Sequence, residues 1–384
     1  MNIAIIENHI ISTNTVRRKL TQTLMEHGYN VTVISTGTTK ELNFAKKLGF
    51  SIIDVGSSST NPVDVIGYMR KIYSALRVIK ADLCLTFTMR PAIWGNLVSR
   101  SMRIPVITNI TGIGPLAEST SMAYRVARAL YTGALRRTKV VFFQNQDDLQ
   151  IFIEKKFIKQ HQAQIIPGSG VDTDFFAPRE KLHNNDKFTF LFISRLIKDK
   201  GILEYAAAAE QIKLDFPNVI CQVIGPYYDQ NLKENTVSEK QIMHWLDEGI
   251  INYLGAAEDV RPFIAAADCI VLPSYREGMS NVLLEASSMQ KPTVASNVTG
   301  CKEIIIDNKT GFLCKVKDVD DLLEKMKKMA SLSESERQQM GVAGRKNIIE
   351  NFTKKIVTDA YLKNIEEILS QKRNRIIPQI LKPA

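Results

Sequence analysis

The sequence predicts an α/β protein of two domains, each built around a doubly wound parallel sheet. Its 384 residues exceed the size of about 250 residues at which one hydrophobic core usually stops growing. Short apolar runs alternate with helical stretches through most of the chain, which is typical of βαβ units. A turn-forming segment, Pro167-Gly-Ser-Gly170, interrupts this alternation, which then restarts. We therefore expect two Rossmann-like domains that face each other across a cleft.

Seven apolar runs in the first half have the length and composition of buried strands. They are Ile3–Ile6, Val31–Ile34, Ser51–Val55, Leu83–Phe87, Pro105–Ile110, Val140–Gln144 and Gln164–Pro167. Six further runs follow the turn in the second half. They are Phe188–Ile193, Val219–Ile224, Ile251–Leu254, Cys269–Leu272, Thr293–Ser296 and Gly311–Lys315.

Three segments follow from this order. Residues 1–170 are predicted to form the N-terminal domain and residues 171–355 the C-terminal domain. Residues 356–384 are helical in pattern and end in a basic tail, Lys372-Arg-Asn-Arg375, and a proline-bearing end. We expect this last helix to cross back to the N-terminal domain.

The composition is that of a soluble globular protein, with 45% hydrophobic and 23% charged residues. No apolar run approaches the roughly 20 residues that span a bilayer, and the first residues resemble a strand rather than a signal peptide. Five scattered cysteines, an odd number, indicate reduced thiols rather than a disulfide framework or a zinc site. We therefore expect a cytoplasmic protein.

The positive charge is concentrated in the first part of the chain. Residues 1–150 hold 18 Lys and Arg against 9 Asp and Glu, a net charge of +9, whereas the other residues hold 32 against 31, a net charge of +1. A basic N-terminal domain indicates an anionic partner. Nucleic acid is not expected, because the chain has no helix-turn-helix, zinc-finger or RNA-recognition signature.

The segment Pro273–Glu285 carries the strongest functional signal. It follows the apolar run Cys269–Leu272, so that Glu277 lies on a loop at the carboxyl end of a strand, where open parallel sheets bind ligands. Four amides that begin the next helix are expected to be unpaired and to face an anion: Gly278, Met279, Ser280 and Asn281. Glu285 lies further along this helix. Two glutamates at this spacing also arise by chance, so the prediction depends on the loop.

Two cationic side chains lie near the start of the second domain, on a loop that also follows a predicted strand. Arg195 follows the apolar run Phe190–Ile193, and Lys200-Gly201 precedes a predicted helix. Paired cations at the carboxyl edge of a sheet would bind a diphosphate and offset the charge of a leaving nucleotide. Solvated charges in a loop are the alternative, and the presence of Glu277 in the same domain favours the functional interpretation.

Four features occur together in the order found in family-4 retaining glycosyltransferases of the GT-B fold, and the chain resembles that family. They are Pro167-Gly-Ser-Gly-Val-Asp172 with Phe175-Phe176, Arg195 with Lys200-Gly201, Tyr253-Leu-Gly255, and Glu277 with Glu285. They span most of the C-terminal domain. The resemblance implies a nucleotide sugar held mainly by this domain, and no metal.

The resemblance also implies a role for each residue of the motif. Arg195 and Lys200 would hold the diphosphate, Glu285 the ribose hydroxyls, and Glu277 the donor sugar. The other implied donor contacts are amides and loops beside the base: Gly278, Met279, Ser280, Asn281, Gly225, Tyr253 and Leu254.

Two N-terminal segments point to one subgroup of this family. Thr86–Gly95 and Asn109–Gly114 resemble bacterial enzymes that extend sugars linked to undecaprenyl diphosphate. These enzymes build O-antigen, lipopolysaccharide, capsule and glycoprotein glycans, and many use UDP-N-acetylhexosamines. The resemblance implies a UDP-linked donor and a lipid-linked sugar acceptor. The residues expected to line the cleft on the acceptor side are Arg90, Thr111, Gly112 and Gly114.

The segment Met122–Lys139 is predicted to be a helix, apolar with interleaved arginines. Those arginines are Arg125, Arg128, Arg136 and Arg137. A basic amphipathic helix in a basic domain suits an anionic membrane surface. We therefore expect peripheral association with the inner face of the cell membrane. A packed helix with ordinary exposed arginines explains the pattern equally well.

The N-terminal domain departs from the family in two places. Many relatives have a glycine-rich loop after the first strand, whereas Glu7–Asn14 contains no glycine. Many also have a histidine after the fifth strand, where this chain has Asn109 and Thr111. His9 is either a substitute polar contact for the donor or incidental.

The expected reaction is sugar transfer with retention at the anomeric carbon. The leaving phosphate would help to deprotonate the acceptor, while Arg195 and Lys200 stabilise its charge. One alternative is a nucleotide-sugar 2-epimerase, against which the few histidines count. Others are a dinucleotide-dependent oxidoreductase, which needs G-x-G-x-x-G after the first strand, and a non-catalytic membrane-surface nucleotide-binding protein. The intact set of Arg, Lys and paired Glu disfavours the last.

Overall fold

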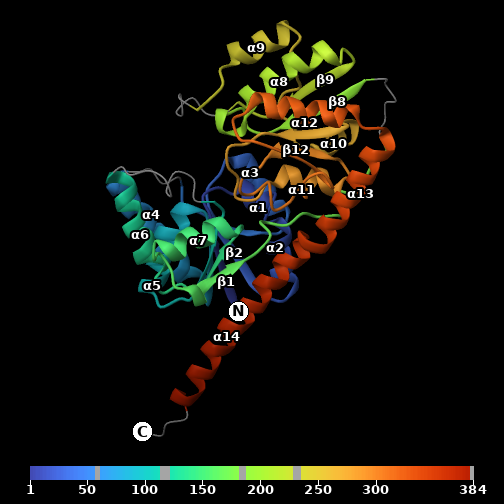
Figure 1. Ribbon diagram of the computed structural model, residues 1–384. Helices are drawn as coiled ribbons and strands as arrows, with labels where there is room; N and C mark the ends of the chain where they lie inside the picture. Colours follow the sequence, from blue (N-terminus) through green and yellow to red (C-terminus); the bar gives the residue numbers. More distant parts are fainter. Residues whose placement is uncertain (57–60, 113–121, 181–186, 228–234, 381–384) are drawn as a thin grey trace. The chain divides into compact units, whose positions relative to one another are not determined.

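The chain forms two compact units, each with one parallel sheet between layers of helices (Figure 1). The computed structural model describes residues 1–56, 61–112, 122–180, 187–227 and 235–380, the side chains of 122–124 and 373–380 excepted. Unit 1 comprises Met1–Ser169 with Lys354–Ala384, and unit 2 comprises Gly170–Thr353. The predicted class of two doubly wound α/β domains is confirmed. That the two units face each other across a cleft stays a prediction.

The sheet of unit 1 has the strand order β3-β2-β1-β4-β5-β6-β7, and all its neighbouring strands are parallel. Its strands are β1 (Asn2–Ile6), β2 (Asn30–Ser35), β3 (Ser51–Asp54), β4 (Leu83–Phe87), β5 (Val106–Ile110), β6 (Val140–Phe143) and β7 (Ala163–Ile165). The central strands are apolar on both faces because helices cover both. The strand order reverses between β1 and β4, which makes this the switch point of the sheet.

Helices connect or flank these strands. They are α1 (Ile11–Asn14), α2 (Arg18–Glu26), α3 (Thr39–Lys47), α4 (Pro62–Ile79), η1 (Pro91–Gly95), α5 (Asn96–Ser101), α6 (Met122–Leu135), α7 (Gln146–Glu154), η3 (Gln160–Gln162) and α14 (Lys354–Ile380). Local sequence sets several of their starts. Thr38 and Glu41 form a capping box on α3, and Asn61 caps α4 ahead of Pro62 at its first position.

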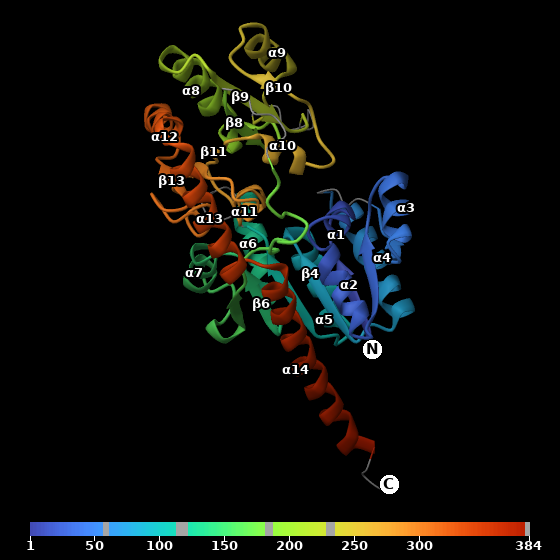
Figure 2. The ribbon, with the colours of Figure 1, turned by 90° about the vertical axis from the view of Figure 1, so that its right-hand side faces the viewer.

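The last helix, α14, completes the core of unit 1. Figures 1 and 2 both show it running beside α2. Tyr361 of α14 is buried, and its ring lies 4.7 Å from that of Phe142. The Asn109 side-chain amide donates a hydrogen bond of 2.8 Å to the Tyr361 hydroxyl. The C-terminal segment is therefore fastened to β5 and β6, although both strands precede it by more than 200 residues.

The sheet of unit 2 has the order β10-β9-β8-β11-β12-β13, and its described pairs are all parallel. Its strands are β8 (Phe188–Ile193), β9 (Val219–Ile224), β10 (Asn252–Tyr253), β11 (Cys269–Leu272), β12 (Thr293–Ser296) and β13 (Gly311–Cys314). The switch point of this sheet lies between β8 and β11.

The helices of unit 2 pack against this sheet. They are η4 (Lys198–Lys200), α8 (Ile202–Asp215), α9 (Glu239–Asp247), α10 (Arg261–Ala266), α11 (Asn281–Ser288), α12 (Val319–Ser331) and α13 (Glu334–Asn351). Ser238, Ser280, Asp318 and Ser333 cap four of them. Throughout the described part of the chain, no helix combines the length and the apolar character that crossing a bilayer requires.

The anchor of α14 gives a stability prediction. Tyr361→Ala is expected to lower the free energy of unfolding by about 3–5 kcal/mol, the usual cost of removing a buried aromatic ring. Tyr361→Phe keeps the ring but leaves the Asn109 amide without its acceptor, at a cost of about 1–3 kcal/mol. Urea denaturation followed by fluorescence measures both. The exposed Tyr73 of α4 is the control, since Tyr73→Phe should change stability by less than about 0.5 kcal/mol. Wild-type stability of Tyr361→Ala would contradict the anchoring role.

Candidate functional site

The loops after β8 and β11 lie next to each other in unit 2, because these two strands pair at the switch point of the sheet. Parallel sheets bind ligands at this position, at the carboxyl ends of the strands. The first loop carries Arg195 and Lys200, and the second carries Glu277. The structure therefore brings Lys200 and Glu277 into contact across 77 positions of sequence.

Glu277 is held by two donors on one carboxylate oxygen. Lys200 Nζ donates to Glu277 Oε1 at 2.6 Å, and the Ser274 hydroxyl donates to the same oxygen at 2.8 Å. The side chains of Lys200 and Glu277 are only 16% and 12% exposed, and Ser274 is fully buried. Hydrogen bonds that involve charged groups are short and strong, so the Glu277 side chain has a fixed position before any ligand arrives.

Two glycines allow the loops to approach this closely. Gly201 and Gly300 have φ angles of +75° and +82°, which favour glycine. A Cβ atom on Gly201 would overlap the carbonyl oxygen of Pro273. A Cβ atom on Gly300 would lie 2.6 Å from Glu277 Cβ. The loop after β12 also accepts a 3.1 Å hydrogen bond from the Glu277 amide through the Thr299 carbonyl, so three loops fix Glu277.

Helix α11 begins directly after this loop. The Ser280 hydroxyl caps it by accepting from the Leu283 amide, and the Met279 side chain is buried. The expectation that the amides of residues 278–281 are all unpaired is wrong for Ser280. Its N–H donates to the Gly300 carbonyl at 3.0 Å, because the loop after β12 folds under the start of the helix.

Glu285 lies within α11, with its side chain half-buried. It is one turn after Asn281, and side chains four residues apart share a helix face. The rise from Asn281 to Glu285 is about 6 Å along the helix axis. Glu277 in the loop and Glu285 in the helix therefore lie at different positions along the axis of α11.

The ends of β8, β9 and β10 hold the other predicted donor residues. A Cβ atom on Gly225 would overlap the Ser194 carbonyl, so this position requires glycine. The Tyr253 hydroxyl donates to the Gly225 carbonyl at 2.9 Å. Arg195 is exposed beside Ser194, and Leu254 is 41% exposed. All these residues lie at or directly after the carboxyl ends of strands of one parallel sheet, at the edge that carries Glu277.

Two neighbouring groups, the Cys301 thiol and the Tyr275 hydroxyl, stay neutral near pH 7. Burial, together with the nearby Glu277 carboxylate, raises the pKa of the Cys301 thiol well above its usual range. Burial and the Glu204 carboxylate, which accepts a 2.7 Å hydrogen bond from the Tyr275 hydroxyl, raise the pKa of Tyr275. The charge of the site is therefore set by its Arg, Lys and Glu side chains. Within the described ranges, no three His, Cys, Asp or Glu residues are grouped to hold a metal ion.

Sequence reasoning missed three residues that support Glu277. They are Ser274, Thr299 and Gly300. Ser274 could have been found, because a serine three positions before a glutamate in a loop is within hydrogen-bonding reach. Thr299 and Gly300 carried no such signal, because their role depends on the pairing of β11 with β12.

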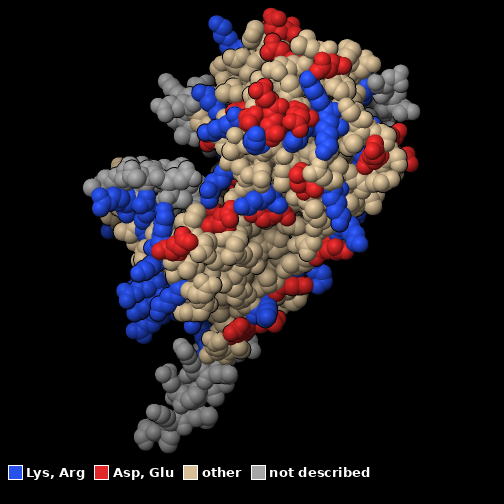
Figure 3. Space-filling view, viewed as in Figure 1, with Lys and Arg blue, Asp and Glu red and all other residues tan. Residues whose placement is uncertain are grey.

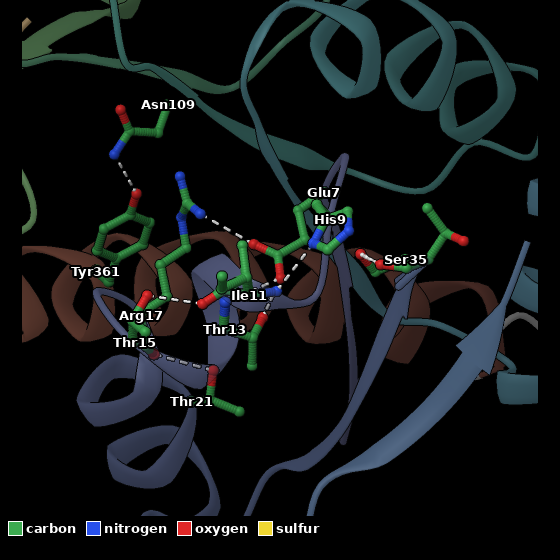
Figure 4. Close-up of polar contacts among 11 residues, drawn as sticks. Glu7, His9, Ile11, Thr13, Thr15, Arg17, Thr21, Ser35, Asn109 and Tyr361 are labelled. Atoms are coloured by element: carbon green, nitrogen blue, oxygen red, sulfur yellow. Dashed lines mark hydrogen bonds and ion pairs between the residues drawn. The ribbon is translucent and has the colours of Figure 1, made fainter. Parts of the chain in front are cut away.

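In unit 1 a buried carboxylate organises the loop after β1 (Figure 4). The Thr13 amide donates to Glu7 Oε1 at 3.1 Å, and the Thr13 hydroxyl donates to the same oxygen. Arg17 Nη1 donates to Glu7 Oε2 at 2.9 Å. Burial raises the pKa of Glu7, against the opposing effects of Arg17 and Thr13. The His9 side chain is 44% exposed, with Nε2 3.8 Å from the Glu41 carboxylate. A contact between His9 and the donor stays a prediction.

The predicted acceptor residues follow neighbouring strands of unit 1. Arg90 is exposed at the start of η1, shortly after β4. Thr111 and Gly112 directly follow β5, which pairs with β4, and Gly112 has a φ angle of +134°. Gly114 lies outside the described residues. Arg90 and Thr111 therefore belong to the same edge of the sheet.

The predicted helix over residues 122–139 is too long. Helix α6 ends at Leu135, so Arg136 and Arg137 lie beyond it. The helix must end here because the Lys139 amide, directly before β6, donates to the Val106 carbonyl of β5. Arg125 is exposed and Arg128 half-buried on the helix, and Arg136 and Arg137 are both exposed. The four arginines do not form one helical face.

Two family models match the chain in succession. "Glycosyl transferase 4-like" matches residues 4–145, and "Glycosyl transferases group 1" matches residues 174–347. The first match lies in unit 1 and the second in unit 2.

Several bacterial glycosyltransferases are similar in sequence. The N,N'-diacetylbacillosaminyl-diphospho-undecaprenol alpha-1,3-N-acetylgalactosaminyltransferase of Campylobacter jejuni is 25% identical over 345 residues, 84% of this chain and 88% of the relative. The UDP-Gal:alpha-D-GlcNAc-diphosphoundecaprenol alpha-1,3-galactosyltransferase of Escherichia coli is 26% identical over 265 residues, 66% and 67% of the two chains. The capsular polysaccharide biosynthesis glycosyltransferase CapM of Staphylococcus aureus is 30% identical over a shorter match, 46% of each chain.

The fold is shared with a solved glycosyltransferase from Rickettsia africae. The TM-score is 0.79 at 21% sequence identity, and the match covers 96% of this chain and 98% of the other. The similarity extends over both units and identifies the architecture as GT-B.

Substitution of Gly300 tests the packing around Glu277. Gly300→Ala is expected to lower the free energy of unfolding by about 3 kcal/mol, because a left-handed conformation costs alanine about 1–2 kcal/mol and the new methyl also overlaps Glu277. Gly249→Ala is the matched control in unit 2, since Gly249 has a φ angle of +65° and a Cβ atom there would have no neighbour within 4 Å. Urea denaturation of both variants gives the difference. Equal losses would show that Gly300 does not pack against Glu277.

Proposed function

Because the chain belongs to the group 1 glycosyltransferases of the GT-B fold, we propose that it moves a sugar from a UDP-linked donor to a sugar on undecaprenyl diphosphate. The named acceptors of the Campylobacter jejuni and Escherichia coli relatives support the lipid-linked acceptor. The UDP-galactose named for the second relative supports a UDP-linked donor. The proposed donor sugar is an N-acetylhexosamine, and the product is a bacterial surface polysaccharide, such as O-antigen or capsule, or a glycoprotein glycan.

One observation carries this proposal: the contact of Lys200 and Ser274 with Glu277 at the switch point of unit 2. A nucleotide sugar presents a diphosphate between a nucleoside and a sugar. A cation beside a fixed carboxylate matches the junction between the diphosphate and the sugar. Glu285, deeper in α11, matches the ribose hydroxyls. The nucleotide base is proposed to lie beside Gly225, Tyr253 and Leu254.

The proposed reaction retains the configuration at the anomeric carbon. The bond from this carbon to the UDP oxygen breaks, and a bond to the acceptor hydroxyl oxygen forms on the same face. The acceptor proton passes to the leaving phosphate. Arg195 and Lys200 stabilise the negative charge that develops there, and Glu277 stabilises positive charge at the sugar ring. These two cations are proposed to replace a metal ion.

The enzyme is proposed to work at the inner face of the cell membrane, where a lipid-linked acceptor is embedded. The excess positive charge of residues 1–150 supports peripheral binding to anionic lipid. Arg125, Arg128, Arg136 and Arg137 contribute to that charge.

Donor binding can be tested with a panel of UDP-, GDP- and ADP-sugars. UDP and one UDP-sugar should raise the Tm of the purified protein, and transfer to a short isoprenyl diphosphate-linked sugar should continue in EDTA, since Arg195 and Lys200 carry the diphosphate charge. Protection by no nucleotide would refute the proposed function. Loss of transfer in EDTA would refute only the metal-free mechanism.

Glu277→Gln separates binding from chemistry. The change removes the negative charge but keeps the side-chain shape, so the rate constant of transfer is expected to fall about 10²–10³-fold. Protection by UDP should persist, because Arg195 and Glu285 are unchanged. Glu210→Gln, at an exposed position on α8, is the control and should keep wild-type turnover. Full activity of Glu277→Gln at saturating donor would remove Glu277 from the mechanism.

A further inference from the structure

A hollow of about 430 Å³ opens at the amino-terminal edge of the sheet of unit 1. Pro105 and Val106 at the start of β5 line it, together with Ala134 near the end of α6 and Ile368 of α14. The predicted acceptor residue Thr111 follows the other end of β5. A strand of this length spans about 15 Å, so the hollow is separate from the carboxyl edge that carries the acceptor residues.

Four cationic side chains surround the hollow: Arg100, Arg103, Arg137 and Lys139. All four residues are exposed. Lys372 also lines the hollow, and it donates to Asp82 Oδ1 at 2.9 Å, so the Asp82 carboxylate balances its charge. None of the described residues that line it is Asp or Glu. The hollow therefore has an excess of positive charge without an internal counter-charge.

A second hollow of about 440 Å³ adjoins the first and shares Arg137, Thr138 and Lys139 with it. It adds Arg136 and Lys159 to the cationic set, and it too has no acidic lining residue among those described. In Figure 3, Lys and Arg side chains gather over the side of unit 1 where Figure 1 labels α5 and α6. The cations thus form a continuous surface around two recesses.

The inner wall of the first hollow is apolar or already hydrogen-bonded. Ile104, Ala134 and Ile368 contribute apolar surface. The Asn96 amide donates to the Thr138 hydroxyl at 3.0 Å, so the polar groups at the base have partners within the protein. A ligand that fits this wall needs an anionic group for the rim and an apolar part for the interior.

We infer that this hollow binds the phosphate of an anionic phospholipid, with the glycerol and upper acyl chains against its apolar wall. A volume of 430 Å³ lies within the usual range for sites that hold small ligands. A free phosphate would use the cations but not the apolar wall, which favours the lipid. The inference rests on the proposed function in one respect, since a lipid-linked acceptor requires the enzyme to work at a membrane.

Short-chain lipids below their micelle concentration test for a pocket rather than for a charged surface. Dihexanoyl-phosphatidylglycerol should bind the full-length protein at a single saturable site, measured by calorimetry, and dihexanoyl-phosphatidylcholine should bind at least about tenfold more weakly. Arg137→Gln with Lys139→Gln should weaken phosphatidylglycerol binding roughly 30-fold, since each basic residue contributes about 1 kcal/mol. Arg70→Gln with Arg77→Gln, an equal charge change on exposed positions of α4, should have less than about a threefold effect.

Two outcomes would overturn the inference. Inorganic phosphate that binds as tightly as the phosphatidylglycerol would assign the hollow to a free anion. Equal losses in the two double variants would assign lipid binding to overall charge. Protection by UDP should be unchanged in Arg137→Gln with Lys139→Gln, because the donor residues lie in unit 2. Failure of UDP protection in the wild type would refute the proposed function while leaving lipid binding measurable.

Discussion

The ion pair between Lys200 and Glu277 is the interaction on which the site depends. It joins the loops after β8 and β11, and it forms only because these strands are neighbours at the switch point. Both side chains are largely buried, and burial of two charges is costly unless further hydrogen bonds compensate. Ser274 supplies one such bond. Gly201 and Gly300 supply the space, because any side chain there would push the loops apart.

This arrangement fixes the charge of the site before a donor arrives. Lys200 neutralises Glu277, so in the proposed reaction a donor diphosphate shares Lys200 with that carboxylate, and Arg195 supplies further positive charge. In that reaction, negative charge moves onto the phosphate and the sugar ring becomes positive as the bond between them breaks. The proposal assigns stabilisation of the phosphate to Lys200 and of the sugar ring to Glu277, so both interactions would be stronger in the transition state than in the ground state.

Sequence predicted the strands better than the contacts between the loops that follow them. Parallel strands are apolar on both faces, so runs such as Phe188–Ile193 were found with their observed ends. The pairing of Lys200 with Glu277 was not predicted, because hydrogen bonds between distant loops depend on strand order. The same holds for Ser280, whose amide was expected to be unpaired but is bonded to Gly300. The helix after residue 122 was predicted too long because its basic, apolar pattern continues into the turn before β6.

The loop after β1 is held by a buried carboxylate in place of the glycine-rich segment of many relatives. In such a segment, small residues let backbone amides approach a phosphate. Here the Glu7 carboxylate accepts hydrogen bonds from the Thr13 amide and the Arg17 guanidinium instead. Arg17 also lies 4.3 Å from the centre of the Phe87 ring and is buried, so it is a packed residue of the core. A donor phosphate at this loop would meet a buried carboxylate whose partners are already committed. The proposed function therefore assigns the diphosphate to Arg195 and Lys200 of unit 2 and the acceptor to the β4 and β5 edge of unit 1.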